Sequence, residues 1–142
     1  MAVEVSVAQP ALQVAIVAEA DLILVRQTLR AASEQAGLGL VDQTRLITAG
    51  SELARNILTH TRDRRGRMAV EQVSTVARRG VRATFDDDGP GIPDLALALT
   101  DGYSTAGSLG LGLPGARRLV DELQLDSAPD RGTTVMIVKW GR

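Results

Sequence analysis

Two stretches in the first half of the chain carry apolar residues at helical spacing. Residues 19–36 repeat apolar side chains every three or four positions, and Gly37 follows where the pattern stops. Residues 42–61 repeat the same spacing, with Asp42 at the start of the pattern. We therefore expect two amphipathic helices, each with one apolar face against a common core.

Five other segments have the alternation or the β-branched composition of strands. They are residues 3–7, 12–17, 68–76, 81–85 and 132–140. We expect two further helices at residues 93–99 and 113–123, the second with Pro114 in its first turn, where proline is tolerated. Because helices and strands mix without regular alternation, the pattern predicts an α+β fold, in which helices cover one face of a mixed sheet as a two-layer sandwich.

The composition is that of a water-soluble globular domain. The chain has 142 residues, of which 44% are hydrophobic and 23% charged, and it has no cysteine. We expect one domain over residues 1–142, located in the cytoplasm, because neither a signal peptide nor a membrane-spanning apolar run is visible. The absence of cysteine excludes a disulfide scaffold and a thiol nucleophile.

The charge pattern argues against nucleic-acid binding. The formal net charge is −1, and the chain has only one Trp, one Tyr and one Phe with which to stack bases. The densest basic run, residues 62–67, is most simply a solvated turn between a helix and a strand.

The chain contains a single lysine, Lys139, among 16 basic residues. A Walker loop requires Gly-Lys-Ser/Thr, and a protein-kinase domain requires a lysine on an early strand. Lys139 lies in the last expected strand and fits neither pattern. Any triphosphate bound here must therefore be neutralised by a divalent metal, by backbone N–H groups at a helix start and by arginine.

Glu52 and Asn56 lie four positions apart on the second expected helix, so their side chains share one face. An amide oxygen is a suitable ligand for magnesium, and a nearby carboxylate can accept a proton from an attacking hydroxyl group. Taken alone this pair is a weak signal, because Arg55 offers the simpler interpretation of a surface ion pair.

Asp87, Gly89 and Gly91 form an Asp-x-Gly-x-Gly pattern at the end of a strand. A carboxylate there can accept the exocyclic amine of adenine, and the glycines allow the backbone to approach the ring. A calcium loop of the EF-hand type is excluded because Leu95 stands where that loop needs glutamate. A plain turn after a strand is the simpler alternative for this segment in isolation.

Gly110, Gly112 and Gly115 match the dinucleotide pattern Gly-x-Gly-x-x-Gly. That pattern must follow a strand, and residues 103–108 before it do not form one. These glycines instead open an expected helix, where N–H groups and the helix dipole favour phosphate. A flexible loop before a helix is the alternative.

Taken in order and spacing, these three pieces and residues 132–134 resemble the N, G1, G2 and GT boxes of the GHKL ATPase and kinase superfamily, whose ATP-binding domain has the Bergerat fold. Within it the chain is most similar to the small serine kinases that control bacterial sigma factors, of the RsbT type found in stressosomes. The similarity runs over residues 21–140. Its most similar segments are residues 51–57, 88–93, 101–105 and 112–115.

The resemblance implies roles for individual residues. Glu52 would be the general base, Asn56 the magnesium ligand and Asp87 the acceptor for adenine. The implied nucleotide-binding set also contains Gly89, Gly91, Ile92, Thr105, Gly110, Leu111 and Gly112, with Thr133 or Thr134 on the base side.

The resemblance also implies an activity. Such kinases transfer the γ-phosphate of ATP, with Mg²⁺, to a serine of a STAS-domain partner, and on release they activate an RsbU-type PP2C phosphatase. Two alternatives stay open: an anti-sigma factor that sequesters a sigma subunit, with kinase activity secondary, and a degenerate GHKL fold that binds a partner without nucleotide. A phosphate-accepting histidine is improbable, because His60 ends a helix with no dimerisation helix before it.

Residues 88–112, which form the lid in that superfamily, contain no Lys or Arg. The metal on Asn56 would therefore carry most of the phosphate neutralisation, helped by Arg55 or Arg117.

Overall fold

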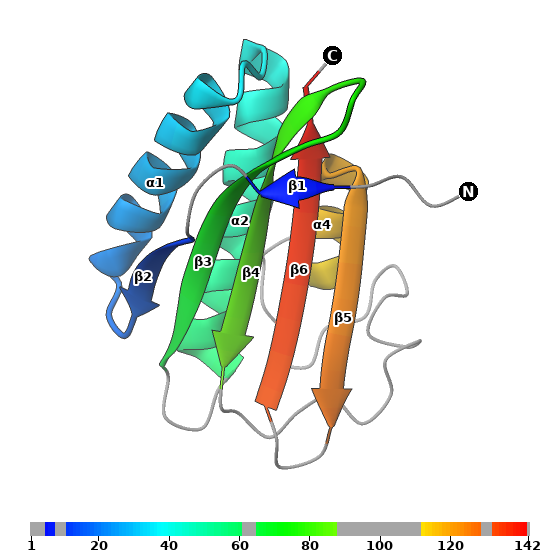
Figure 1. Cartoon of the computed structure of the whole chain (residues 1–142). Coiled ribbons are helices and arrows are strands. Elements are labelled where there is room, and N and C mark those ends of the chain that lie inside the picture. Colours follow the sequence, from blue (N-terminus) through cyan, green and yellow to red (C-terminus); the bar gives the residue numbers. More distant parts are fainter. Residues whose placement is uncertain (1–4, 8–10, 61–64, 88–111, 129–131, 142) are drawn as a thin grey trace.

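Figure 1 shows the computed structural model, which describes residues 5–7, 11–60, 65–87, 112–128 and 132–141. In chain order the elements are β1 (Ser6–Val7), β2 (Leu12–Ile16), α1 (Asp21–Gln35), α2 (Leu40–His60), β3 (Gly66–Ser74), β4 (Arg79–Asp87), α4 (Gly112–Leu119), β5 (Glu122–Ala128) and β6 (Gly132–Trp140). Among these elements, no helix is both long and apolar enough to cross a membrane.

The strands form one sheet in the order β1-β3-β4-β6-β5, with β2 also paired to β3. Helices α1, α2 and α4 all lie behind this sheet in Figure 1. The α+β class with helices on one face is therefore confirmed. The sheet is not mixed as expected, because every described pairing is antiparallel. Strands β3 and β4, like β5 and β6, follow one another through short connections, which favours antiparallel pairing.

Alternation along the central strands sets which side chains face the helices. On β4, Val81, Ala83 and Phe85 are buried in the main core. On β6, Ile137 is paired with Ala83 and Val135 with Phe85, and both are buried in the same core. Because side chains alternate with period two, the next helix-facing pair toward the strand ends is Asp87 and Thr133. The helix-facing positions of β4 and β6 therefore change from apolar core residues to the polar pair Asp87 and Thr133 at the strand ends.

The third helix is shorter than the sequence pattern predicts. We expected a helix over residues 113–123, but α4 ends at Leu119 and β5 begins at Glu122. Leu123 therefore lies on a strand, where it and Leu125 pack at the edge of the core. Their alternation with Glu122 and Gln124 is a strand pattern that the helical interpretation overlooked. Residues 93–99 lie outside the described residues.

The only lysine of the chain is buried in an ion-pair cluster. Its Nζ lies 3.4 Å from Oδ1 of Asp42, in the first turn of α2, and 3.2 Å from Oδ1 of Asp121. The other carboxylate oxygen of Asp121 accepts the backbone N–H of Trp140 at 2.7 Å. Lys139 thus ties the start of α2 to the end of β6 that is far from Thr133.

Gly66 allows α2 to pack closely over the opposite end of the sheet. A Cβ built on Gly66 would collide with the backbone carbonyl oxygen of Asp86 and would lie 3.0 Å from Cγ2 of Ile57. The backbone oxygen cannot move aside, and Ile57 is buried in the core. A side chain at this position would therefore push α2 away from the end of β4.

We predict that Gly66→Ala lowers the free energy of unfolding by about 1–3 kcal/mol, the usual cost of overpacking. Urea denaturation measures this change. Gly39→Ala is the matched control, because a Cβ at Gly39 meets no atom within 4 Å; it should change stability by about 0.5 kcal/mol or less. Equal stabilities of the two variants would contradict the close approach.

Candidate functional site

Glu52 and Asn56 lie one turn apart on α2, and both are half-buried. The Oε1 atom of Glu52 is buried and has no hydrogen-bond partner in the described structure. An unpaired buried polar atom costs about 1–3 kcal/mol, so its persistence calls for a functional explanation. Within the described part of the chain, no group supplies the hydrogen bond that this carboxylate oxygen can accept.

The surface ion pair that was the simpler interpretation of this segment does not involve Glu52. Arg55 instead lies 3.9 Å from Oε1 of Glu19, and both side chains are exposed. Ion pairs of this kind contribute little to stability. In the described structure, Arg55 thus pairs with Glu19 and not with Glu52.

A second arginine, Arg26, braces the helix that carries Glu52. Its Nε donates a hydrogen bond to Oγ of Ser51 at 3.2 Å, which links α1 to α2 directly before Glu52. Sequence reasoning missed this contact, since 25 positions separate the two residues and no local pattern connects them.

Three polar side chains form a row across the end of the sheet. Asp87 on β4 is paired in register with Thr133 on β6, which is paired with Ser127 on β5. The backbone N–H of Thr133 donates to Oδ1 of Asp87 at 3.2 Å, and the hydroxyl oxygens of Thr133 and Ser127 lie 2.9 Å apart. A carboxylate can accept about four hydrogen bonds, of which the N–H of Thr133 supplies one to Asp87.

The pairing register of β4 and β6 places the two candidate threonines, Thr133 and Thr134, opposite different aspartates. Thr134 donates through its hydroxyl to Oδ1 of Asp86 at 2.6 Å, one position along from the Asp87–Thr133 pair. Because neighbouring strand residues point to opposite faces, Thr134 lies on the face away from the helices. The structure brings Thr133, and not Thr134, to Asp87.

Close packing of α2 brings Glu52 and Asn56 toward this end of the sheet. Gly50 of α2 lies against the ring of Phe85, and Ile57, next to Asn56, lies against Gly66 beside the Asp86 carbonyl. The half of α2 that carries Glu52 and Asn56 therefore runs along the last residues of β4, as Figure 1 also shows. Carboxylate, amide and strand-end groups share one end of the molecule.

Helix α4 packs against α2 and begins at Gly112. Gly112 has a φ of 67°, a left-handed conformation that glycine adopts without strain. Glycine is thus required where the chain enters the helix. The first N–H groups of a helix lack intrahelical partners and attract anions.

The remaining candidates lie outside the described residues. They are Gly89, Gly91, Ile92, Thr105, Gly110 and Leu111. Within the part of the chain that is described, no group of three or more His, Asp or Glu residues could hold a metal. A divalent ion at Asn56 would therefore need oxygen ligands from a substrate, as magnesium commonly does beside phosphates.

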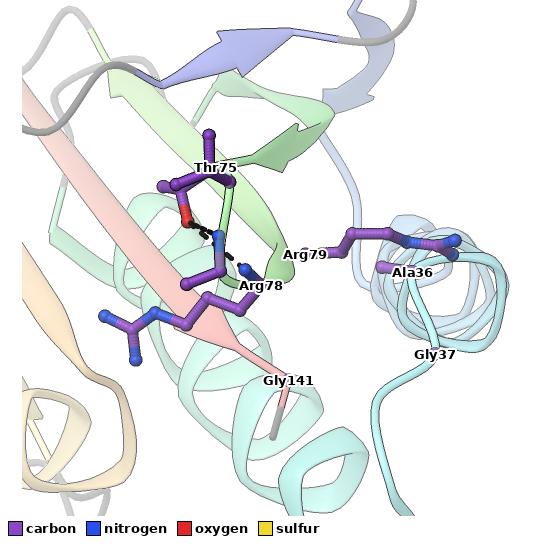
Figure 2. A pocket seen from close by; sticks show the side chains of 8 residues that line it. Ala36, Gly37, Thr75, Arg78, Arg79 and Gly141 are labelled. Carbon is purple, nitrogen blue, oxygen red and sulfur yellow. Dashed lines mark hydrogen bonds between the residues drawn. The ribbon is translucent and has the colours of Figure 1, made fainter.

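A hollow of about 490 Å³ lies at the opposite end of the sheet, beside the turn between β3 and β4. Its lining includes Arg78, Arg79 and Gly37, and none of the candidate residues. Figure 2 shows the two arginine side chains pointing away from each other. Arg79 donates to the carbonyl of Gln35 at the end of α1, while Arg78 lies over the ring of Trp140, 4.9 Å from its centroid. Both arginines serve structural contacts and do not converge on a ligand.

Comparison with known proteins supports the resemblance. Residues 41–140 match the family of histidine kinase-, DNA gyrase B- and HSP90-like ATPases. The chain is 43% identical over 129 residues to the serine/threonine-protein kinase RsbT of Bacillus subtilis (strain 168), covering 91% of this chain and 96% of that protein. It is 30% identical over 117 residues to an anti-sigma F factor of Bacillus licheniformis, with 80% of each chain covered.

A solved structure shows the same fold. The crystal structure of the RsbU and RsbW domains of Rv1364c from Mycobacterium tuberculosis superimposes with a TM-score of 0.65 at 22% identity, over 94% of this chain and 33% of that one. The chain thus spans about a third of that longer protein. With the family match and the identity to RsbT, this places the chain in the histidine kinase-, DNA gyrase B- and HSP90-like ATPase family, among the relatives of the serine/threonine kinase RsbT.

Proposed function

We propose that this chain is a magnesium-dependent protein serine kinase that transfers the γ-phosphate of ATP to a serine of a STAS-domain partner. The observation that carries the proposal is the buried, unpartnered Oε1 of Glu52, one helical turn from Asn56 and at the same end of the fold as Asp87. The 43% sequence identity to the serine/threonine-protein kinase RsbT supports the reaction class.

The sheet end would hold the base of the nucleotide. Asp87 accepts the exocyclic amine of adenine, and its orientation is fixed by the N–H of Thr133. The start of α4 at Gly112 faces the phosphates with its unpaired N–H groups. These groups bind and orient ATP without a lysine.

Asn56 suits magnesium because its amide oxygen is a hard, neutral ligand on a half-buried helical position. When bound, the ion would neutralise charge on the phosphate oxygens. Since the chain offers one amide there and no carboxylate cage in its described part, the nucleotide must supply most of the remaining ligands.

Glu52 would act in the chemical step itself. The serine hydroxyl oxygen of the partner forms a bond to the γ-phosphorus, its proton passes to Oε1 of Glu52, and the electron pair of the breaking P–O bond leaves with ADP. Oε1, which has no hydrogen-bond partner among the described residues, gains one in this step.

We further propose that the chain works as a partner-switching regulator in the cytoplasm, where it binds an RsbU-type phosphatase after release from its STAS partner. The relationship to RsbT supports this arrangement. The second candidate function is that of an anti-sigma factor, which the relationship to anti-sigma F factors favours. A pull-down with purified sigma subunit separates the two, since only the anti-sigma function requires a stable complex.

We predict that Glu52→Ala lowers kcat for phosphorylation of a STAS partner by about 100- to 10,000-fold, the usual contribution of general-base catalysis. The Kd for ATP should stay within about threefold of wild type, because the base acts only in the chemical step. Radiolabelled transfer and calorimetry measure the two quantities. Thr44→Ala on the same helix is the control, since the exposed Thr44 hydroxyl donates to the carbonyl of Leu40 in the first turn. Transfer by Glu52→Ala at the wild-type rate would show that the role is misassigned.

We predict that removal of Mg²⁺ with EDTA weakens ATP binding by about tenfold or more, because the phosphate charge then has no lysine to offset it. Asn56→Ala in Mg²⁺ should show a loss of the same order. Thr59→Ala, on the same helix and bonded only to the Arg55 carbonyl, should behave as wild type. Undiminished ATP affinity in EDTA would refute the metal site.

A further inference from the structure

Helix α1 contacts two successive residues of α2 directly before Glu52. A Cβ built on Gly50 would collide with Cδ1 of Leu29, so the glycine allows the two helices to approach closely there. The Nε of Arg26 donates to Oγ of Ser51 at 3.2 Å. Arg26 and Leu29 are three positions apart on α1 and therefore share one face. That face of α1 thus supplies both an apolar and a polar contact to this turn of α2.

The two contacts constrain α2 in different ways. The apolar contact at Gly50 sets the distance between the helices, but it leaves α2 free to rotate about its own axis. The hydrogen bond has a preferred direction, and both of its side chains are half-buried, so it opposes such a rotation. Because Glu52 is the next residue, a rotation of α2 would move its carboxylate. The contact between Arg26 and Ser51 therefore determines where the carboxylate lies.

The position of Glu52 matters because of its role in the proposed function. A general base must lie within about 3 Å of the proton that it accepts. Among the described residues, Oε1 of Glu52 has no hydrogen bond that would hold it in place. Its location therefore depends on side-chain packing and on the orientation of the helix that carries it.

We infer that Arg26 is a positioning residue for the general base: through Ser51 it holds the turn of α2 before Glu52 in the orientation that proton transfer requires. This inference rests on the proposed function. A displacement of about 1 Å can lower a rate about 100-fold, even when the altered residue lies away from the reacting atoms. An arginine that only stabilised the helix pair would change the melting temperature and leave the rate of transfer unchanged.

The test measures the single-turnover rate of phosphoryl transfer to a purified STAS-domain partner, and the Kd for ATP with Mg²⁺, at a temperature where every variant is folded. Ser51→Ala and Arg26→Ala should each lower the rate by about ten- to a hundredfold, with the Kd for ATP within about threefold of wild type. Ser51→Ala keeps the charge of Arg26 and introduces a better helix former, so its loss would come neither from a missing cation nor from an unfolded helix. The double variant should lose no more than either single variant, because both remove the same contact.

A background without the general base shows whether the contact acts through Glu52. In Glu52→Ala, the addition of Arg26→Ala should cause no further loss, because the group that it positions is gone. Arg30→Ala is the matched control: it removes an exposed arginine one turn further along α1 and should leave the rate unchanged.

A wild-type rate in Ser51→Ala would overturn the inference. So would an equal loss from Arg26→Ala in the presence and absence of Glu52, since the arginine would then act on another group. A wild-type chain that transfers no phosphate to a STAS-domain partner would instead overturn the proposed function, so the two failures are distinguishable.

Discussion

The antiparallel register of β4, β6 and β5 is the constraint on which the candidate site depends. It aligns Asp87, Thr133 and Ser127 in one row although 46 positions separate the first two. Because side chains alternate along a strand, a slip of one residue in any of these strands would send its member of the row to the face away from the helices. The buried series that ends in Phe85 and Val135 prevents this slip, so core packing fixes the polar row.

The first turn and the second half of α2 each carry a carboxylate, and the two differ in whether the described chain supplies a partner. At its start, Asp42 is held by Lys139, which also meets Asp121, so the charges there are compensated within the chain. In its second half, Glu52 has a buried oxygen that the described structure leaves unpaired. A buried group without a partner lowers stability, and proteins retain such groups mainly where a ligand completes them. The first turn of the helix thus anchors the fold, and under the proposed function its second half supplies the general base.

Much of the fold was predictable from the sequence, and so were the motifs, because each depends on residues close together in the chain. The helical spacing of α1 and α2 and the position of Asp87 at a strand end are local features of this kind. Strand β5 was missed because its leucines also extend the apolar pattern of the helix before it. The choice between Thr133 and Thr134, and the contacts of Ser127, depend on strand register, which the sequence does not display. For the same reason Arg26 gave no signal, since it meets α2 only through helix packing.

The central claim is that the ends of β4 and β6 hold a purine while the second half of α2 holds the metal and the phosphates. A crystal structure of the chain with a non-hydrolysable ATP analogue and Mg²⁺ tests it most directly. The account predicts the exocyclic amine within hydrogen-bond distance of Asp87, the metal on the amide oxygen of Asn56, and Oε1 of Glu52 facing the γ-phosphate. A nucleotide bound elsewhere, or a region between α2 and the end of β4 filled by packed side chains, would contradict it.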